Sequence, residues 1–304
     1  MSPDRTESVL VEDVRVDGPH GPLRLRTYTP EQTAMQSGLV WVHGGAVIEG
    51  SLDMPEADWV ARSLAVAGIP VVSVDYRLAP PIAEFGWDLP PSDEVVFPVA
   101  SEEVTAAFSL AADTRIAGVT HWSLGGASAG GNLAAGAAMR LRDLGGATPR
   151  SLVLAYPLAH RVLPAQTPEL AVKTSALPDS ARFKPGMVAL MNDNYVGHSG
   201  AAGSPYAFPG GEDVSSLPPV LIVNSDADDL RSSGQAFASE LAAAGVDVAV
   251  VRENGTRHGH LNDPAHPGAT RTVERFRSWL TTIDLQASAH DIPIEDANSE
   301  RWGA

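Results

Sequence analysis

The sequence contains no cysteine, which excludes disulfide bonds, thiolate metal sites and a thiol nucleophile. Its 304 residues include no apolar run of about 18 residues or more, so we expect no membrane span. Basic residues are scarce: 21 Lys and Arg stand against 37 Asp and Glu, and the net charge is −16. Because nucleic acids and anionic membranes bind basic surfaces, neither is expected as the main partner. The first residues lack the basic and apolar regions of a signal peptide, so we expect a cytoplasmic protein.

The order of apolar segments predicts an α/β fold. Apolar residues make up 44% of the chain and charged residues 19%, as in folded globular proteins. Short apolar runs predict strands at residues 39–42, 69–74, 119–124, 151–156, 220–224 and 246–252, after an antiparallel pair within residues 9–28. Helical spacing predicts helices at residues 58–67, 101–112, 132–144, 234–244 and 270–280, with Ser101 capping the second. This alternation predicts a mostly parallel central sheet with helices on both faces.

Two long segments interrupt the alternation. Residues 80–98 are rich in proline and acidic residues, and residues 160–219 are irregular, with scattered glycine and proline. Because connections of this length are usually lids or binding loops, we expect one domain over residues 1–304 with cap elements at about 80–98 and 160–217. The polar C-terminal tail, residues 284–304, is expected to be a mobile or partner-docked arm, with simple disorder as the favoured alternative. His160 stands in loop-like sequence and is expected to face solvent.

The segment GASAG at residues 126–130 has the context of a nucleophile elbow, because it follows a predicted strand and opens a predicted helix. Glycines on both sides of Ser128 leave room for a tight turn, which presents the hydroxyl at the carboxyl edge of the sheet. The N-terminus of the following helix offers partial positive charge to a developing anion. A turn without function is the alternative, which the strand and helix on either side make less favoured. Ser128 is therefore the candidate nucleophile.

A second glycine-rich segment, HGGA at residues 43–46, follows the apolar strand predicted at residues 39–42. Glycines after a strand leave main-chain N–H groups free to bind an oxyanion. With the elbow downstream, the expected donors are the N–H groups of Gly45, Ala46 and Ala129, with Gly44 as a further candidate. His43 is expected to brace this loop by hydrogen bonds.

A serine nucleophile needs a base and an acid that orients the base. Three carboxylates, Asp226, Asp228 and Asp229, follow the strand predicted at residues 220–224. His258 and His260 follow the next strand, so the order serine, acid, histidine is that of an α/β-hydrolase. The residues alone leave the choice among the three carboxylates and between the two histidines open.

The motifs together resemble one family. The segments HGG at residues 43–45, VDYRLAP at 74–80 and GASAGGN at 126–132 are similar to those of the hormone-sensitive-lipase-like branch of α/β-hydrolase esterases. In that family the acid opens a D-P-L-R-x-x-G segment. DDLRSSG at residues 228–234 matches it with Asp229 at the proline position, which implies Asp228 as the acid. The closing G-x-x-H-G-F matches GTRHGH at residues 255–260, which implies His258 as the base and puts His260 where phenylalanine is usual.

The resemblance implies the α/β-hydrolase fold and a serine carboxylesterase that hydrolyses small to medium uncharged esters without a metal or an organic cofactor. One alternative is an amidase, formamidase or peptidase using the same three residues, and another is a non-catalytic binding protein on this fold. A metal site at His258, His260 and Asp263 is disfavoured, because zinc needs three or four ligands and no thiolate or His-x-x-x-His pattern is present. Family analogy also allows a homodimer.

Side chains near these motifs receive supporting roles. Asp226 and Asp229 are expected to be solvated or to support the acid, and His260 is expected on the pocket wall. Several large side chains of the two cap segments either line an acyl pocket or pack the cap onto the sheet. They are Phe85, Trp87, Leu89, Phe97, Phe183, Met187, Met191, Tyr195, Tyr206 and Phe208.

Overall fold

The computed structural model describes residues 9–33, 35–82, 95–114, 118–197 and 203–290, with side chains up to residue 285. Its strands are β1 (Val9–Gly18), β2 (Gly21–Pro30), β3 (Ser37–Val42), β4 (Val71–Asp75), β5 (His121–Ala127), β6 (Leu152–Ala155), β7 (Val220–Ala227) and β8 (Val248–Arg257). They form one sheet in the order β1-β2-β4-β3-β5-β6-β7-β8. The pairs β1–β2 and β2–β4 are antiparallel, and all other pairs are parallel.

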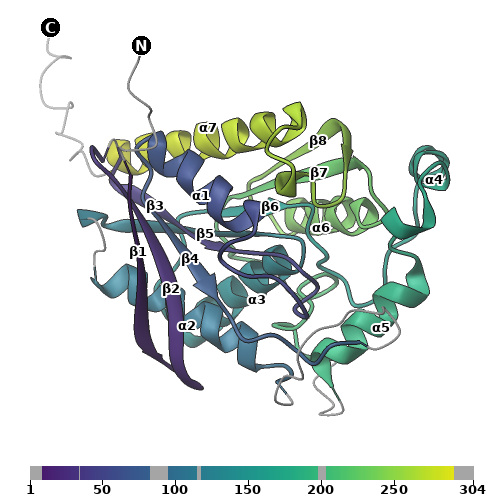
Figure 1. Ribbon diagram of the computed structural model, residues 1–304, viewed down its shortest axis with the longest axis horizontal. Coiled ribbons are helices and arrows are strands. Elements are labelled where there is room, and N and C mark those ends of the chain that lie inside the picture. Colours follow the sequence, from purple (N-terminus) through teal and green to yellow (C-terminus); the bar gives the residue numbers. More distant parts are fainter. Residues whose placement is uncertain (1–8, 34, 83–94, 115–117, 198–202, 291–304) are drawn as a thin grey trace, which may run out of the picture.

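Helices cover both faces of this sheet (Figure 1). They are α1 (Pro55–Val66), α2 (Val99–Thr114), α3 (Ala129–Leu144), α4 (Pro168–Ser175), α5 (Pro185–Val196), α6 (Arg231–Ala243) and α7 (Pro267–His290), with short 3₁₀ turns η4 (Asp179–Ala181) and η6 (His260–Asn262). Apolar residues of α1 and α7 share one core cluster with the sheet, whereas those of α2, α3 and α6 share another. The structure thus confirms the predicted mostly parallel α/β sheet with helices on both faces.

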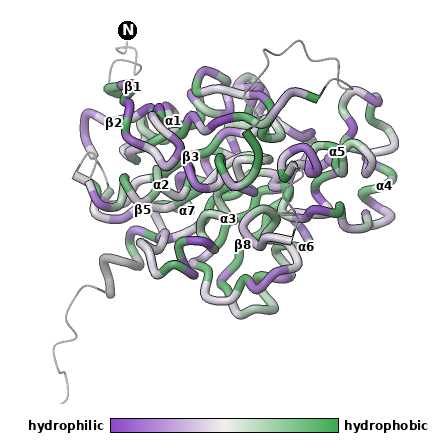
Figure 2. Tube along the Cα trace, turned by 90° about the horizontal axis from the view of Figure 1, so that it is seen from below, coloured by the Kyte–Doolittle hydropathy of each residue, from purple (hydrophilic) through white to green (hydrophobic). Residues whose placement is uncertain are grey.

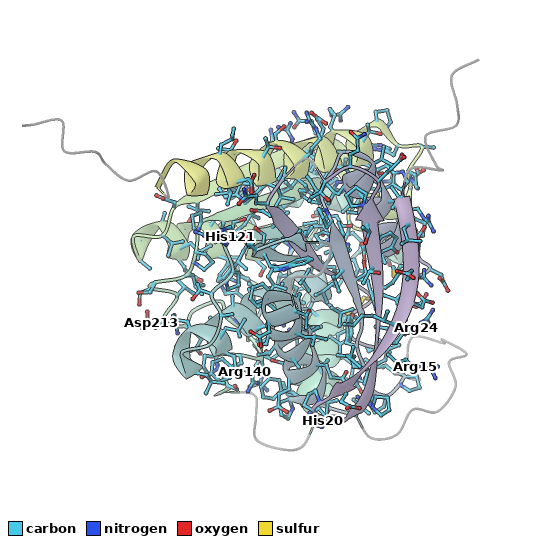
Figure 3. The ribbon with its side chains drawn as sticks, turned by 90° about the vertical axis from the view of Figure 1, so that its left-hand side faces the viewer. Arg15, His20, Arg24, His121, Arg140 and Asp213 are labelled. Carbon is cyan, nitrogen blue, oxygen red and sulfur yellow. The ribbon has the colours of Figure 1, made fainter. Side chains whose placement is uncertain are left out.

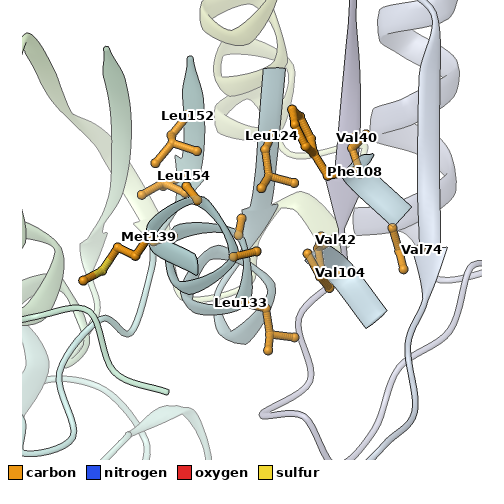
Figure 4. Packing of buried hydrophobic residues seen from close by; sticks show 14 of the residues in the cluster. Val40, Val42, Val74, Val104, Phe108, Leu124, Leu133, Met139, Leu152 and Leu154 are labelled. Atoms are coloured by element: carbon orange, nitrogen blue, oxygen red, sulfur yellow. The ribbon is translucent and has the colours of Figure 1, made fainter. Parts of the chain in front are cut away.

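The parallel strands are apolar because they are covered on both sides. Every residue of β3 and β6 is buried. Figure 4 shows the packing on one face: leucines of β5 and β6 lie beside Leu133 and Met139 of α3, while Val104 and Phe108 of α2 lie beside valines of β3. Removing this much apolar surface from water is the main source of stability, at about 25 cal/mol per Å². The site at the carboxyl ends of the strands therefore rests on a packed base.

The antiparallel edge is the polar side of the sheet. β1 and β2 form the predicted hairpin, with Gly18 paired to Gly21 across the turn. His20 lies at this turn and Arg24 on β2, as Figure 3 shows. Arg24 forms ion pairs with Asp13 at 2.5 Å and Asp75 at 3.4 Å. Charged pairs of this kind suit an edge strand, because they discourage pairing with another chain.

The second predicted cap segment contains α4, η4 and α5, which lie together at one end of the molecule (Figure 1 and Figure 2). Residues 83–94, most of the first predicted cap segment, lie outside the described residues. The flanks of that segment contact α5: Asn194 Nδ2 donates to the Pro80 carbonyl at 2.9 Å, and Phe97 N–H donates to the Tyr195 carbonyl at 2.8 Å. The division into one domain with these cap elements stays a prediction.

Three expectations about local structure are wrong. Helix α2 begins at Val99, so Ser101 is not its cap; it is buried inside the helix, where its hydroxyl accepts a hydrogen bond from Arg140. Helix α7 does not end at the predicted residue 280 but runs to His290; Ile283 packs into the core, and Asp284 accepts a hydrogen bond from Ser37. His160 is buried rather than solvated, since Ser233 and Glu240 supply hydrogen-bond partners at 2.8 and 2.9 Å.

None of the helices in the described ranges combines the length and apolar character needed to cross a bilayer. The cytoplasmic location and the homodimer stay predictions.

Candidate active site

Ser128 stands in the tight turn between β5 and α3, as the elbow motif predicts. Its backbone has φ 54° and ψ −118°, a conformation that a residue with a side chain adopts only under constraint. The flanking glycines make the turn possible. A Cβ on Gly126 would lie 2.4 Å from Gly130, and a Cβ on Gly130 would lie 2.2 Å from the Val42 carbonyl oxygen. The close approach of α3 to β3 therefore requires glycine at both positions.

Three side chains from distant parts of the chain meet in a line of hydrogen bonds. Ser128 Oγ lies 2.9 Å from His258 Nε2, and His258 Nδ1 lies 2.8 Å from Asp228 Oδ2. The Asp228 side chain is fully buried, and its second oxygen accepts a hydrogen bond from the Leu230 N–H at 2.9 Å. Asp228 can thus hold the imidazole with Nδ1 protonated, which leaves Nε2 free to accept the serine proton.

The surroundings of His258 tune it as a base. Burial alone would lower the pKa of His258, but the charge and hydrogen bond of Asp228 outweigh burial and raise the pKa above its ordinary value. The rings of Tyr156 and Phe183 meet the imidazole edge to face at centroid distances of 5.0 and 4.6 Å. These contacts fix the plane of the ring.

The loop after β3 presents unpaired N–H groups beside Ser128. Gly45, Ala46 and Val47 all have positive φ, and the Gly45 carbonyl closes the turn by accepting from the N–H groups of Ile48 and Glu49. Within the described part of the chain, the N–H groups of Gly45 and Ala46 have no acceptor. The Ala129 N–H opens α3, where a helix has no internal acceptor to offer. Gly45, Ala46 and Ala129 line one cavity together with Ser128.

Gly44, the fourth expected donor, is engaged elsewhere. Its N–H donates to Glu56 Oε1 at 2.7 Å, and Gly44 does not line the cavity. The expectation that its N–H could face an oxyanion is therefore wrong. The physical reason is that a carboxylate from the start of α1 turns this donor away from the cavity.

Glu56 is a site residue that the sequence reasoning missed. Its side chain is buried and accepts hydrogen bonds from the Tyr156 hydroxyl at 2.6 Å and Asn262 Nδ2 at 3.3 Å, in addition to Gly44. Burial raises the pKa of Glu56, and the hydrogen bonds from Tyr156 and Gly44 oppose this rise. An acidic residue in the first turn of a helix is common, so its sequence position carried no signal.

His43 braces the loop, as expected. Its ring stacks on the Tyr76 ring at a centroid distance of 4.4 Å, and His43 Nδ1 lies 2.8 Å from the Gly44 carbonyl oxygen. The Tyr76 hydroxyl donates to the carbonyl oxygens of His43 and Gly44 at 2.9 and 3.1 Å. The VDYRLAP segment thus supports the turn that carries the unpaired N–H groups.

A cavity of about 550 Å³ opens above Ser128 and His258. Its apolar wall consists of Met54, Leu158, Phe183, Met187, Met191 and Leu230. A second, much smaller cavity of about 20 Å³ shares Ala46, Ala129, Leu158 and Met191 with the first and continues toward Tyr195 and Phe208. Five of the large cap side chains singled out in the sequence therefore line cavities, whereas Phe97 packs in the core, and Phe85, Trp87 and Leu89 lie outside the described residues.

The other acidic and histidine candidates lie apart from the line of three. Asp226 pairs with Lys173 at 2.5 Å and Asp229 with Arg182 at 2.8 Å, so both support neighbouring segments. His260 does not line the cavity, contrary to expectation. It is buried between Ser225 and Thr272 at 2.9 and 2.8 Å, and burial lowers its pKa to about 4. In the described ranges, no group of three or more His, Asp or Glu residues could hold a metal ion.

These features define a hydrolase of the α/β class: a strained serine, a half-buried histidine and a buried aspartate in line with it, and unpaired amides at the end of a mostly parallel sheet. The chain matches the family described as alpha/beta hydrolase fold over residues 39–262, and it belongs to that family. Esterase LipI of Mycobacterium tuberculosis is 34% identical over 87% of this chain and 79% of the relative. Carboxylic ester hydrolase LipN of the same organism is 32% identical over 90% of this chain and 72% of the relative.

Solved structures of esterases are similar to this chain as well. A Pyrobaculum calidifontis esterase superposes with a TM-score of 0.76 at 33% identity, covering 90% of this chain and 85% of that one. The carboxylesterase EstE1, cloned from a metagenomic library, gives a TM-score of 0.77 at 28% identity, covering 90% and 89%. The comparisons confirm the resemblance, the expected fold and the expected class of carboxylic ester hydrolase. The roles of the individual site residues stay predictions.

Proposed function

We propose that this protein is a serine carboxylesterase in which Ser128 is the nucleophile, His258 the general base and Asp228 the residue that orients the base. The observation that carries the proposal is the line of hydrogen bonds from Ser128 through His258 to Asp228, at 2.9 and 2.8 Å, beside unpaired N–H groups. The names of the relatives, which include esterases and a carboxylic ester hydrolase, support the same reaction.

The reaction follows from these positions. Ser128 Oγ attacks the ester carbonyl carbon while His258 Nε2 takes the hydroxyl proton, and the buried Asp228 carboxylate stabilises the imidazolium. The N–H groups of Gly45, Ala46 and Ala129 bind the oxyanion that forms on the carbonyl oxygen. The tetrahedral intermediate collapses, and the alcohol leaves with the proton from His258. Water then attacks the acyl-enzyme by the same route and releases the acid.

The charges around the large cavity favour an uncharged substrate of small to medium size. Arg182, which lines the cavity, is paired with the Asp229 carboxylate at 2.8 Å. Glu56, also in the wall, is hydrogen-bonded to Gly44, Tyr156 and Asn262. Neither group is left to bind an ion. Glu49, the other carboxylate of the lining, is exposed to solvent, and the large apolar side chains of the wall are those of methionine, leucine and phenylalanine. About 550 Å³ of space holds a small organic ester.

A matched panel of p-nitrophenyl esters and p-nitroanilides tests the reaction type. We expect turnover of acetate and butanoate p-nitrophenyl esters, with kcat/KM for the corresponding anilides at least about a hundredfold lower, because amide leaving groups need more assistance. Comparable or higher activity on the anilides would favour the amidase alternative. No turnover of any ester, with a folded protein, would favour a binding function.

A further inference from the structure

Four hydrogen bonds join Asp229 to the cap. Its side chain is 2% exposed, and its carboxylate accepts from Arg182 Nε at 2.8 Å and Arg182 Nη2 at 3.0 Å. The Phe183 N–H donates at 2.9 Å and Gln166 Nε2 at 2.8 Å. All four donors belong to residues 166–183, the stretch that includes α4 and η4. A buried, bidentate arginine–carboxylate pair is a strong and directional contact.

The four hydrogen bonds hold a carboxylate that is charged at neutral pH. Burial alone would raise the pKa of Asp229, but hydrogen bonds from Arg182, Gln166 and Phe183 outweigh burial and lower it. Asp228 and Asp229 are adjacent in sequence, yet the first holds His258 and the second holds the cap.

The four hydrogen bonds fix one wall of the large cavity. Arg182 and Phe183 both line that cavity, and the Phe183 ring lies 4.6 Å from the His258 ring. In the proposed reaction His258 Nε2 hands its proton to the leaving alcohol. The alcohol must therefore lie on the His258 side of Ser128, next to Phe183.

The acyl group lies on the other side. Once the oxyanion faces the N–H groups and the alcohol faces His258, the acyl chain can only point away from His258. The small cavity lies in that direction, since it shares Ala46, Ala129, Leu158 and Met191 with the large one but is lined by neither His258 nor Phe183. The two halves of an ester are thus bounded by different residues.

We propose that Asp229 is a positioning residue that sets selectivity for the alcohol of the substrate by holding Phe183 over the leaving-group side. This inference rests on the proposed esterase function. In Asp229→Asn the side chain keeps its size, but its NH₂ group would face the donors of Arg182, so the bidentate contact is lost. Phe183 is then no longer held, while the acyl side keeps its walls.

Two pairs of substrates measure the selectivity for the alcohol and for the acyl group separately. The ratio of kcat/KM for benzyl acetate over ethyl acetate reports the alcohol side, and the ratio for ethyl hexanoate over ethyl acetate reports the acyl side. In Asp229→Asn we expect the first ratio to fall about fivefold, the size of one aromatic contact, and the second to stay within about twofold. Phe183→Ala should lower the first ratio similarly, and the double variant should lower it no further.

Glu169→Gln is the matched control. Glu169 also joins α4 to neighbouring elements, through Arg231 of α6 and Arg252 of β8, but it does not line the cavity, so both ratios should stay at their wild-type values. A general loss of stability would lower all rates together and leave both ratios unchanged. The inference is overturned if Asp229→Asn changes neither ratio or changes both equally. It is also overturned if the double variant lowers the first ratio by the full product of the two single effects. Wild-type protein without activity on any of the three esters contradicts the proposed function instead.

Discussion

Replacing Glu56 with glutamine tests whether this buried carboxylate organises the site. Glu56 accepts hydrogen bonds from the Gly44 N–H at 2.7 Å, the Tyr156 hydroxyl at 2.6 Å and Asn262 Nδ2 at 3.3 Å. These partners come from the loop after β3, the end of β6 and the turn η6, which also follows His258. Glu56→Gln keeps the shape but gives one side of the group an NH₂, which would face donors.

The expected loss of activity follows from one broken hydrogen bond. Losing one hydrogen bond to a buried charged group costs about 1.5–3 kcal/mol. If the hydrogen bond to the Gly44 N–H is the one lost, kcat/KM falls about tenfold to a hundredfold, because the neighbouring N–H groups are no longer held in position for the oxyanion. The charge of Glu56 also helps to raise the pKa of His258. The acid limb of the pH–rate profile should therefore move to lower pH in the variant.

The assay is hydrolysis of p-nitrophenyl acetate across a pH series, with thermal unfolding measured alongside. Glu49→Gln is the matched control, because Glu49 also lines the large cavity but is exposed. Its kcat/KM and acid limb should stay near wild type. If Glu56→Gln keeps both the wild-type kcat/KM and the wild-type acid limb, Glu56 does not organise the site and the reasoning is refuted.

Three further predictions concern the acid, the base and the elbow. Asp228→Asn should lower kcat by about 10⁴, because it favours the wrong imidazole tautomer, and Asp226→Asn should cost far less in the same assay; the reverse ranking would identify Asp226 as the acid. Wild-type kcat/KM should rise with pH along a limb whose midpoint lies above about 6.5, because the pKa of His258 is raised and only its neutral form accepts a proton; a lower midpoint contradicts this. Gly130→Ala should lower the free energy of unfolding by about 2 kcal/mol or more in denaturant titrations, because the new Cβ would lie 2.2 Å from a backbone carbonyl oxygen. Gly186→Ala, which has open space around it, should leave the free energy of unfolding unchanged, and equal losses in the two variants would contradict the packing.

The sequence predicts those parts of the site that depend on local pattern. Ser128 is recognisable because its glycines and its place between a strand and a helix are consecutive in the chain. His258 and Asp228 are recognisable because their segments match a known pattern. The sheet is predictable because a strand buried on both faces, such as β3, must be apolar throughout.

The parts that the sequence does not predict depend on which side chain reaches a given atom across the fold. Nothing near Gly44 indicates that Glu56 takes its N–H, because that contact requires α1 to pack beside the loop. Asp229 resembles a solvated residue until the cap is placed beside it. The sequence around His160 is typical of a loop, and only the fold brings Ser233 and Glu240 close enough to hydrogen-bond its ring.

The most direct test of the account is to react the protein with a fluorophosphonate and locate the adduct by peptide mass spectrometry. Only a serine activated by a neighbouring base reacts rapidly with this reagent. We expect one adduct, on Ser128, together with loss of ester hydrolysis, and we expect Ser128→Ala to be folded, unlabelled and at least about 10⁴-fold slower. Labelling at another serine, or near-normal ester hydrolysis by Ser128→Ala, would contradict the account.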